Sequence, residues 1–318
     1  MKDNMCYVKS FDIKKHNNGK CLIKLFMFNL VLLLHLTVSL GIVKLRDEKA
    51  THIDLTGIKG PYTYRNYCRI KSGELWWTEG EGGVGLTSPD GEGKEFQVSS
   101  TALNGIFFIS PYKGWVVGDG GTIFYTDNRG EIWSQQDSGT KVDLSAVTCT
   151  DENNCWVVGK QGTILSTKNA GSSWIQLEPK TQEDLLSLSF VSTKNGWVVG
   201  DNGVVLETND NGKSWQSYGK YLQTLNENSP YPNYRTQSPN FIFVKFIDKK
   251  KGWVATRDAV ASTRNGGINW EIIHLETTLI GLAIHDHLHL VAVSLYGDNY
   301  VSNDGGISWQ KRKTVVSK

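Results

Sequence analysis

Short apolar segments rich in β-branched and aromatic residues alternate with turns rich in glycine, asparagine, aspartate and serine along most of the chain. Gly105–Ile109, Trp115–Val117 and Thr122–Thr126 are three consecutive segments of this kind. Apolar runs of this length, bounded by turn-forming residues, are typical of β-strands. No helical periodicity is found after residue 43, so the pattern predicts an all-β fold.

The tryptophans repeat at a fixed spacing. Trp115, Trp156 and Trp197 recur at one constant interval, and each is followed by a second tryptophan at a shorter spacing that is the same in all three copies. The interval is close to the repeat length of about 40 residues in which four short strands form one propeller blade. Six copies are found, of which the first and the last two are more degenerate. The sequence therefore predicts a β-propeller of six four-stranded blades over residues 44–318, or of seven if the termini form a composite blade.

The turn before the second tryptophan of each regular copy has the sequence Ser/Thr-x-Asp/Asn-x-Gly-x-x-Trp, which resembles the Asp-box, also called the BNR repeat. We expect the Asp or Asn side chain to bond backbone amides of its own turn, and the glycine to take the positive φ that the turn needs. Three of the five regular copies carry Asn, which favours a structural role over calcium binding or catalysis. The five positions are Asn128, Asn169, Asp210, Asn265 and Asp304.

The consensus motif of the repeat, GWVVGDxGxIxxTxDxGxxW, is similar to that of the photosystem II stability/assembly factor propellers. The resemblance covers residues 62–318 and is strongest over 114–215. It implies an exported, non-catalytic propeller that binds protein partners, assists the assembly or stability of a membrane protein complex and takes part in photosynthesis. We expect no cofactor and no metal. Because the same pattern occurs in exported proteins of non-photosynthetic bacteria, it implies the fold more directly than the process.

The first 43 residues have the composition of a targeting segment. Residues 1–24 contain six lysines and two aspartates, and the apolar stretch 25–43 follows. Nineteen residues can cross a bilayer as a helix, and the preceding lysines favour a cytoplasmic N-terminus. We expect a signal-anchor helix or a cleaved signal peptide. The propeller would then be exported and membrane-anchored, facing the periplasm, the thylakoid lumen or the cell exterior.

Charge and cysteine usage agree with export. The chain has a net charge of +2, of which residues 1–43 contribute +4, so residues 44–318 carry −2 and lack the basic footprint of a nucleic-acid binder. Cys149 ends one expected strand and Cys155 begins the next, with a hairpin loop between them. The sequence predicts a disulfide between these two cysteines, which would persist only in an oxidising compartment.

Two alternative functions remain, a sialidase-like glycoside hydrolase and a carbohydrate-binding lectin. Asp-box propellers include sialidases, which hold a carboxylate with three arginines and carry a Phe/Tyr-Arg-Ile-Pro motif. The segment 67–71, Tyr-Cys-Arg-Ile-Lys, matches that motif only with an insertion and without the proline. His285, His287 and His289 alternate along an expected strand, a spacing that could offer metal ligands. A solvent-facing strand side is the simpler interpretation, so we predict no enzymatic activity and no metal site.

An insertion interrupts the repeat between Trp197 and Trp253, whose separation in the chain is longer than the regular interval. The segment Tyr218–Asn240 holds four of the twelve tyrosines and three of the seven prolines. Loops on rigid scaffolds often carry binding specificity, and Tyr and Arg are favoured at interfaces, whereas a disordered excursion is the alternative. We predict a monomer that binds a membrane or exported protein complex. The candidate partner-binding residues are Tyr218, Tyr221, Tyr231, Tyr234, Arg235, Arg65, Arg69 and Arg257.

Overall fold

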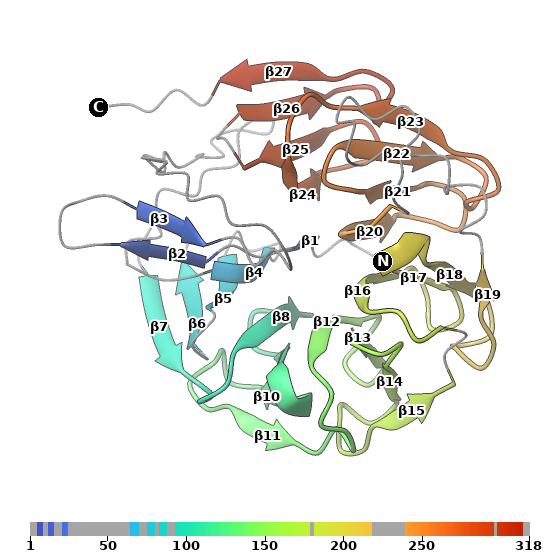
Figure 1. Ribbon diagram of the computed structural model, residues 1–318. Helices are drawn as coiled ribbons and strands as arrows, with labels where there is room; N and C mark the ends of the chain where they lie inside the picture. Colours follow the sequence, from blue (N-terminus) through green and yellow to red (C-terminus); the bar gives the residue numbers. More distant parts are fainter. Residues whose placement is uncertain are drawn as a thin grey trace.

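The described part of the chain forms a ring of six antiparallel sheets in a computed structural model (Figure 1). The first strand of each sheet lies at the centre of the ring, and successive first strands are in contact from β4 through β24. The prediction of an all-β propeller with six four-stranded blades is confirmed. The structure describes residues 93–178, 181–217, 239–295 and 298–313, together with the strands at 5–8, 12–15, 21–24, 64–69, 75–79 and 83–87.

Each blade is a meander of consecutive antiparallel strands, as short apolar runs joined by tight turns dictate. Blade 1 contains β4 (Tyr64–Arg69), β5 (Leu75–Glu79), β6 (Gly83–Thr87) and β7 (Gly93–Gln97). Blade 2 contains β8 (Leu103–Phe108), β9 (Gly114–Gly118), β10 (Ile123–Thr126) and β11 (Ser134–Gln136). Blade 3 contains β12 (Leu144–Cys149), β13 (Cys155–Gly159), β14 (Ile164–Thr167) and β15 (Ile175–Leu177).

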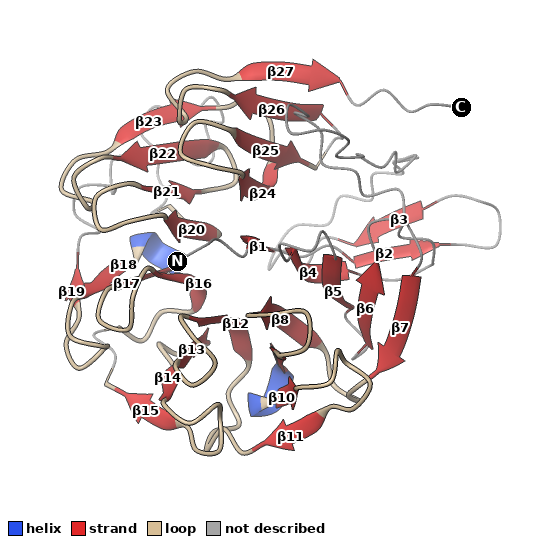
Figure 2. Cartoon of the chain, turned by 180° about the vertical axis from the view of Figure 1, so that it is seen from behind, coloured by secondary structure: helices blue, strands red, loops and turns tan. Residues whose placement is uncertain are grey.

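The other three blades repeat this order. Blade 4 contains β16 (Leu185–Phe190), β17 (Gly196–Gly200), β18 (Val205–Thr208) and β19 (Gln216–Ser217). Blade 5 contains β20 (Phe243–Phe246), β21 (Gly252–Ala255), β22 (Ala259–Thr263) and β23 (Glu271–His274). Blade 6 contains β24 (Leu279–Ile284), β25 (Leu290–Ser294), β26 (Asp298–Ser302) and β27 (Gln310–Lys313). Figure 2 shows the short 3-10 helices η1 (Asp119–Gly121) and η2 (Asp201–Gly203) after the second strands of blades 2 and 4.

Three further strands come from the segment to which the sequence assigns a targeting role. Strand β1 (Met5–Val8) pairs with β4 and contacts β24, while β2 (Asp12–Lys15) and β3 (Cys21–Lys24) form a separate hairpin. The apolar stretch 25–43, where we expect a helix, lies outside the described residues. No helix within the described ranges is long and apolar enough to cross a membrane.

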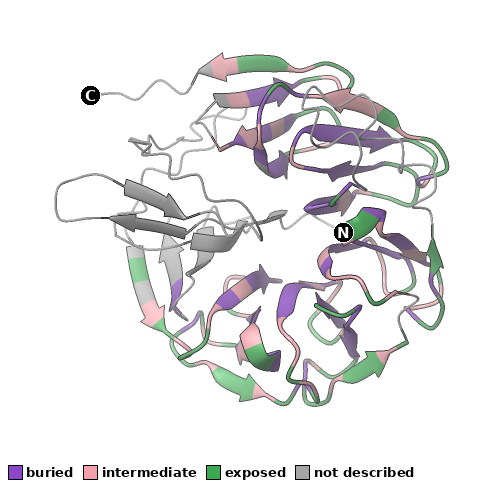
Figure 3. Ribbon diagram, in the orientation of Figure 1, coloured by how far each residue is buried: buried purple, intermediate pink, exposed green. Residues whose placement is uncertain are grey.

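The core lies between neighbouring blades, where inner strands are buried and outer strands are exposed (Figure 3). Trp197 of β17 stacks on Phe246 of β20 in the next blade, with ring centroids 3.6 Å apart and an interplanar angle of 6°. Phe246 in turn meets the edge of Trp270, at a centroid distance of 6.2 Å. Gly252 pairs with Phe246 across the strands, and a Cβ atom there would clash with the ring. The phenylalanine wedge between two blades therefore requires glycine opposite it.

A disulfide replaces this wedge in blade 3. Cys149 and Cys155 form the disulfide and occupy the paired positions that hold phenylalanine and glycine in blades 2, 4 and 5. Both cysteines are buried in one cluster with Trp115, the second-strand tryptophan of the preceding blade. The two sulfur atoms thus fill the place of a ring against the neighbouring tryptophan.

Candidate partner-binding surfaces

Blades 2–6 present two kinds of loop at opposite ends of their strands. Hairpins between the first and second strands lie on the same side as the Asp-box turns between the third and fourth strands, and we call this side the Asp-box face. Turns between the second and third strands lie with the connections between blades on the other side, the connector face. On the Asp-box face, backbone amides of the Asp-box turns donate hydrogen bonds to the hairpin of the same blade. Asn211 N donates to Lys194 O at 3.1 Å, and Gly266 N donates to Lys250 O at 2.8 Å.

The Asp-box turns are closed by their own side chains. In blade 4, Thr208 Oγ1 donates to Asp210 Oδ1 at 2.9 Å and accepts from Gly212 N at 2.8 Å. Asp210 Oδ1 also accepts from Ser214 N at 2.9 Å, and Gly212 has a φ of 79°. The same bonds recur at Asn128, Asn169, Asn265 and Asp304, so Asn and Asp perform the same structural task at the predicted positions.

We expect Thr208→Val to destabilise the propeller by about 1–3 kcal/mol. Valine keeps the shape of threonine but leaves the buried amide of Gly212 without its acceptor. Urea unfolding followed by tryptophan fluorescence measures the effect. Thr208→Ser retains the hydroxyl that Ser302 supplies in blade 6, so it serves as the control. A valine variant as stable as the serine variant would contradict the structural role of the hydroxyl.

The two acidic boxes differ from the amide boxes in how they respond to pH. Partial burial opposes ionisation of Asp304, but hydrogen bonds from Ser308 and Ser302 outweigh it and hold its pKa at about 2 instead of 3.8. A carboxylate with a lowered pKa in the folded state stabilises the fold above its unfolded pKa and loses that contribution as the pH falls through its folded pKa. Asp304 therefore contributes stability that disappears between about pH 4 and pH 2.

Asp304→Asn is expected to flatten the fall in the free energy of unfolding between pH 4 and pH 2, since an amide does not titrate there. Asn169→Asp is the reciprocal variant, because Ser173 lies at its side chain as Ser308 does at Asp304. It should steepen the same fall. Urea midpoints at pH 5, 3 and 2 measure both changes, and unchanged slopes would show that the acidic boxes do not control acid stability.

Side chains on the connector face bond the turn of the preceding blade. Asp143 Oδ1 accepts from Gly120 N at 2.9 Å, and Asn240 Oδ1 accepts in the same way from Asn202 N at 3.0 Å. Pro239 O accepts from Gly203 N at 2.6 Å. Pro239 and Asn240 therefore belong to the regular repeat. Our assignment of them to the insertion was wrong, because a bond of the same kind joins Gln161 N to Asp184 Oδ1 between blades 3 and 4, and the irregular segment is 218–238.

The predicted partner-binding residues are distributed over both faces. Arg257 lies half-buried in the turn between β21 and β22, on the connector face, where its carbonyl oxygen accepts from Leu279 N. Arg65 lies near the connector end of β4 and Arg69 at its Asp-box end, so one strand holds them at opposite edges. Segment 218–238 lies between β19 and blade 5 in the chain, and its residues lie outside the described ones. These residues are Tyr218, Tyr221, Tyr231, Tyr234 and Arg235.

The histidine cluster does not lie along a strand, and that expectation was wrong. β24 ends at Ile284 and β25 begins at Leu290, so His285, His287 and His289 occupy the hairpin loop between them. Partial burial disfavours the Asp286 carboxylate, but bonds from His289 outweigh it and hold the pKa of Asp286 at about 2. Across the described ranges, no three His, Cys, Asp or Glu side chains form a group that could hold a metal ion.

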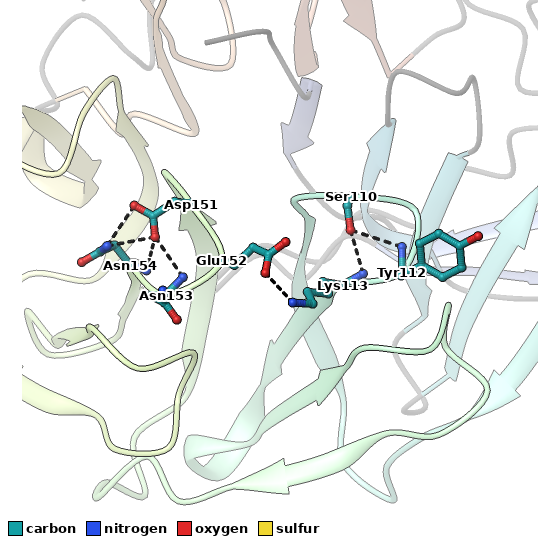
Figure 4. Close-up of polar contacts among 7 residues, drawn as sticks. All are labelled: Ser110, Tyr112, Lys113, Asp151, Glu152, Asn153 and Asn154. Atoms are coloured by element: carbon teal, nitrogen blue, oxygen red, sulfur yellow. Dashed lines mark hydrogen bonds and ion pairs between the residues drawn. The ribbon is translucent and has the colours of Figure 1, made fainter.

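An ion pair between blades lies on the Asp-box face and was missed from the sequence. Lys113 of the β8–β9 hairpin binds Glu152 of the β12–β13 hairpin, whose loop is closed by the Cys149–Cys155 disulfide (Figure 4). A hydrogen bond from Lys113 to Glu152 raises the pKa of that lysine. Asp151 Oδ1 accepts from the backbone amides of Asn153 and Asn154, each at 2.9 Å, which fixes the loop. The pairing partners are 39 residues apart, close to one repeat, which is the signal that could have indicated it.

The sequence also matches a known family. The sequence model described as "Photosynthesis system II assembly factor YCF48" matches residues 92–182 and 172–314, more than half of the chain. The chain belongs to this family. The assignment agrees with the family resemblance of the repeats, while no curated protein matches the sequence.

Solved structures show the same fold. A structure described as "YCF48 bound to D1 peptide" is similar with a TM-score of 0.55 and 16% identity, covering 77% of this chain and 76% of that one. The WD40 propeller domain of Doa1 has a TM-score of 0.57 at 10% identity, with coverage of 76% and 79%. A designed protein, Ika8, has a TM-score of 0.57 at 14% identity, with coverage of 82% and 86%. At these identities the similarities establish the propeller fold of this family member.

Proposed function

We propose that this chain is an exported, membrane-anchored propeller that binds a segment of a membrane protein and assists the assembly or stability of its complex without catalysing a reaction. The observation that carries the proposal is the family match over residues 92–314. The matched region is a propeller whose Asp-box turns are held by hydrogen bonds from their own side chains. A related propeller is described as bound to D1 peptide, which supports a polypeptide as the ligand.

The connector face at blades 4 and 5 is the surface we assign to this partner. Segment 218–238 breaks the sequence repeat between blades 4 and 5, and Arg257 lies on the connector face of blade 5. Pro239 and Asn240 fix the end of the segment to blade 4 through Gly203 and Asn202. A segment that departs from the repeat and is attached to such a rigid support is where specificity is often carried.

The test is a pull-down from native membranes after mild crosslinking, with the full chain as bait. The comparison bait lacks residues 218–238 and retains Pro239 and Asn240, so that the bonds between blades 4 and 5 remain. Matching urea midpoints establish that both baits are folded. We expect the full chain to recover a defined membrane protein complex and the deletion variant to lose it.

Three results would contradict the proposal. Equal recovery by both baits would place the partner elsewhere on the propeller. If neither bait recovers a complex, partner binding itself fails. Turnover of a sialic acid conjugate, or retention on a glycan array, would instead support the sialidase-like or lectin alternative.

A further inference from the structure

The exposed large apolar side chains of the described residues all lie on the Asp-box face. They belong to hairpins, to Asp-box turns and to the first position of an outermost strand, and they come from blades 2, 3, 5 and 6. Three of them, Ile132, Ile268 and Ile307, are in Asp-box turns and are 65%, 53% and 46% exposed. The other three are Tyr112, Ile175 and Leu288.

These side chains are presented by fixed backbone. Ile132 N donates to Asn128 Oδ1 at 3.0 Å, and Ile307 N donates to Asp304 Oδ1 at 3.0 Å. Gly305 N, in the same turn as Ile307, donates to Leu288 O in the neighbouring hairpin at 2.9 Å. The exposure of the isoleucines is therefore part of the folded turns.

A basic sector lies on the same face in blades 4 and 5. Its acidic side chains are Asp210, Asp248 and Glu271, the last at the first position of β23. Asp210 and Asp248 accept hydrogen bonds from amides of their own turns, at 2.9 Å from Ser214 and at 2.7 Å from Lys250. These carboxylates are thus partly compensated within the protein. The basic side chains of the sector are all exposed, and they are Lys194, Lys213, Lys249, Lys250, Lys251 and Arg264.

The connector face has the opposite charge. Carboxylates gather there over blades 2–4, where Lys141 and Lys160 are the basic side chains of the described loops, and Arg257 follows in blade 5. Asp143 binds Lys160 at 2.7 Å, and this hydrogen bond raises the pKa of Lys160. The Asp-box face also holds carboxylates in blades 2, 3 and 6, so its attraction to an anionic surface comes from the basic sector of blades 4 and 5, while the connector face is repelled from such a surface. These carboxylates are Asp127, Glu131, Asp151, Glu152, Asp286 and Asp304. The carboxylates of the connector face are Asp119, Asp137, Asp143, Glu178, Glu183, Asp184 and Asp201.

We propose that the Asp-box face docks on the surface of an anionic lipid bilayer. The apolar side chains are spread around the ring over four blades, so one extended peptide would cover only part of them, whereas a bilayer is an extended surface that can reach several blades. Ile268 lies in the basic sector, and lysines beside an exposed apolar side chain are the combination that binds anionic headgroups and enters the acyl boundary. Docking of this face leaves the connector face and Arg257 directed away from the lipid, free for a protein partner. The proposal does not depend on the identity of that partner.

Lysine footprinting of the full chain on vesicles tests the orientation. The chain is mixed with vesicles of phosphatidylglycerol and phosphatidylcholine, or of phosphatidylcholine alone, and amine labelling is read by mass spectrometry. We expect anionic vesicles to slow labelling of Lys194, Lys213 and Lys249 several-fold and to leave Lys141 unchanged. Because the comparison is between faces of one molecule, attachment through residues 25–43 does not produce this result.

Two kinds of variant separate the contributions of charge and apolar contact. Serine at Lys249, Lys250 and Lys251 should lower the ratio of docked to undocked protein on the order of 100-fold, about fivefold for each lysine, with Lys194 and Lys213 as reporters. Ile268→Ser with Ile307→Ser should weaken protection while preserving its dependence on anionic lipid. Lys141→Ser, on the connector face, is the matched control and should change nothing.

Three results would overturn the proposal. Equal protection of the lysines from labelling by neutral and anionic vesicles would show that docking does not depend on the charge of the lipid. Protection of Lys141 in place of Lys249 would show that the other face docks. Protection by soluble polyglutamate without protection by vesicles would assign the basic sector to an acidic polypeptide.

Discussion

Loss of the Cys149–Cys155 disulfide is expected to lower the free energy of unfolding by about 2–4 kcal/mol. The bond closes a short loop, so the chain-entropy contribution lies at the lower end of this range. The sulfur atoms also fill the space against Trp115 that an aromatic ring fills in other blades. Urea unfolding with and without reductant measures the change, and Cys149→Ser with Cys155→Ser reproduces it without a reductant.

The matched variant replaces the two cysteines by the phenylalanine and glycine that occupy the same positions in the neighbouring blades. Cys149→Phe with Cys155→Gly installs the pair that occurs as Phe190 and Gly196 in blade 4. We expect this variant to be more stable than the double serine variant and to have the same urea midpoint with and without reductant. Equal stability of the serine and phenylalanine variants would show that the disulfide acts only by closing the loop and not by packing between blades.

The repeat made much of the fold predictable, because each blade must bury the same apolar positions against its neighbours. The strand order and the Asp-box bonds follow from the constant interval between tryptophans and from turn chemistry that is local. That Cys149 and Cys155 face each other across paired strands also followed from their positions on the two sides of a hairpin loop. In each case, the interactions that decide the structure lie within one repeat.

The strand bulges and the position of the histidine loop were not predictable from the repeat in the same way. The second residue of β8 is a bulge between Leu103 and Gly105, and β4 has the same irregularity between Tyr64 and Asn66, at Arg65. Bulges bend a strand locally and have no strong sequence signal. Alignment on the repeat would have indicated that residues 285–289 form a hairpin loop, since they correspond to 150–154 in blade 3. The alternation of histidine with other residues instead resembled the two-residue period of a strand and led to the wrong prediction.

Trp197→Ala is expected to destabilise the propeller by about 3–5 kcal/mol. Trp197 is 1% exposed, and its ring stacks on Phe246 of the next blade at 3.6 Å, so the substitution opens a cavity at the junction of blades 4 and 5. Ile175→Ser is the control, because that side chain is 61% exposed and its change should stay within about 0.5 kcal/mol. Thermal and urea unfolding measure both.

A double-mutant cycle with Phe246→Ala separates the stacking from the cavity. If the two rings act as one wedge, the double variant loses less than the sum of the single variants, with a coupling of about 0.5–1.5 kcal/mol beyond the buried area. Segment 218–238 joins these same two blades, so a loosened junction should also weaken capture of the membrane partner. Additive losses would show that the rings stabilise their blades independently, and partner capture would then follow the stability of blade 5 alone.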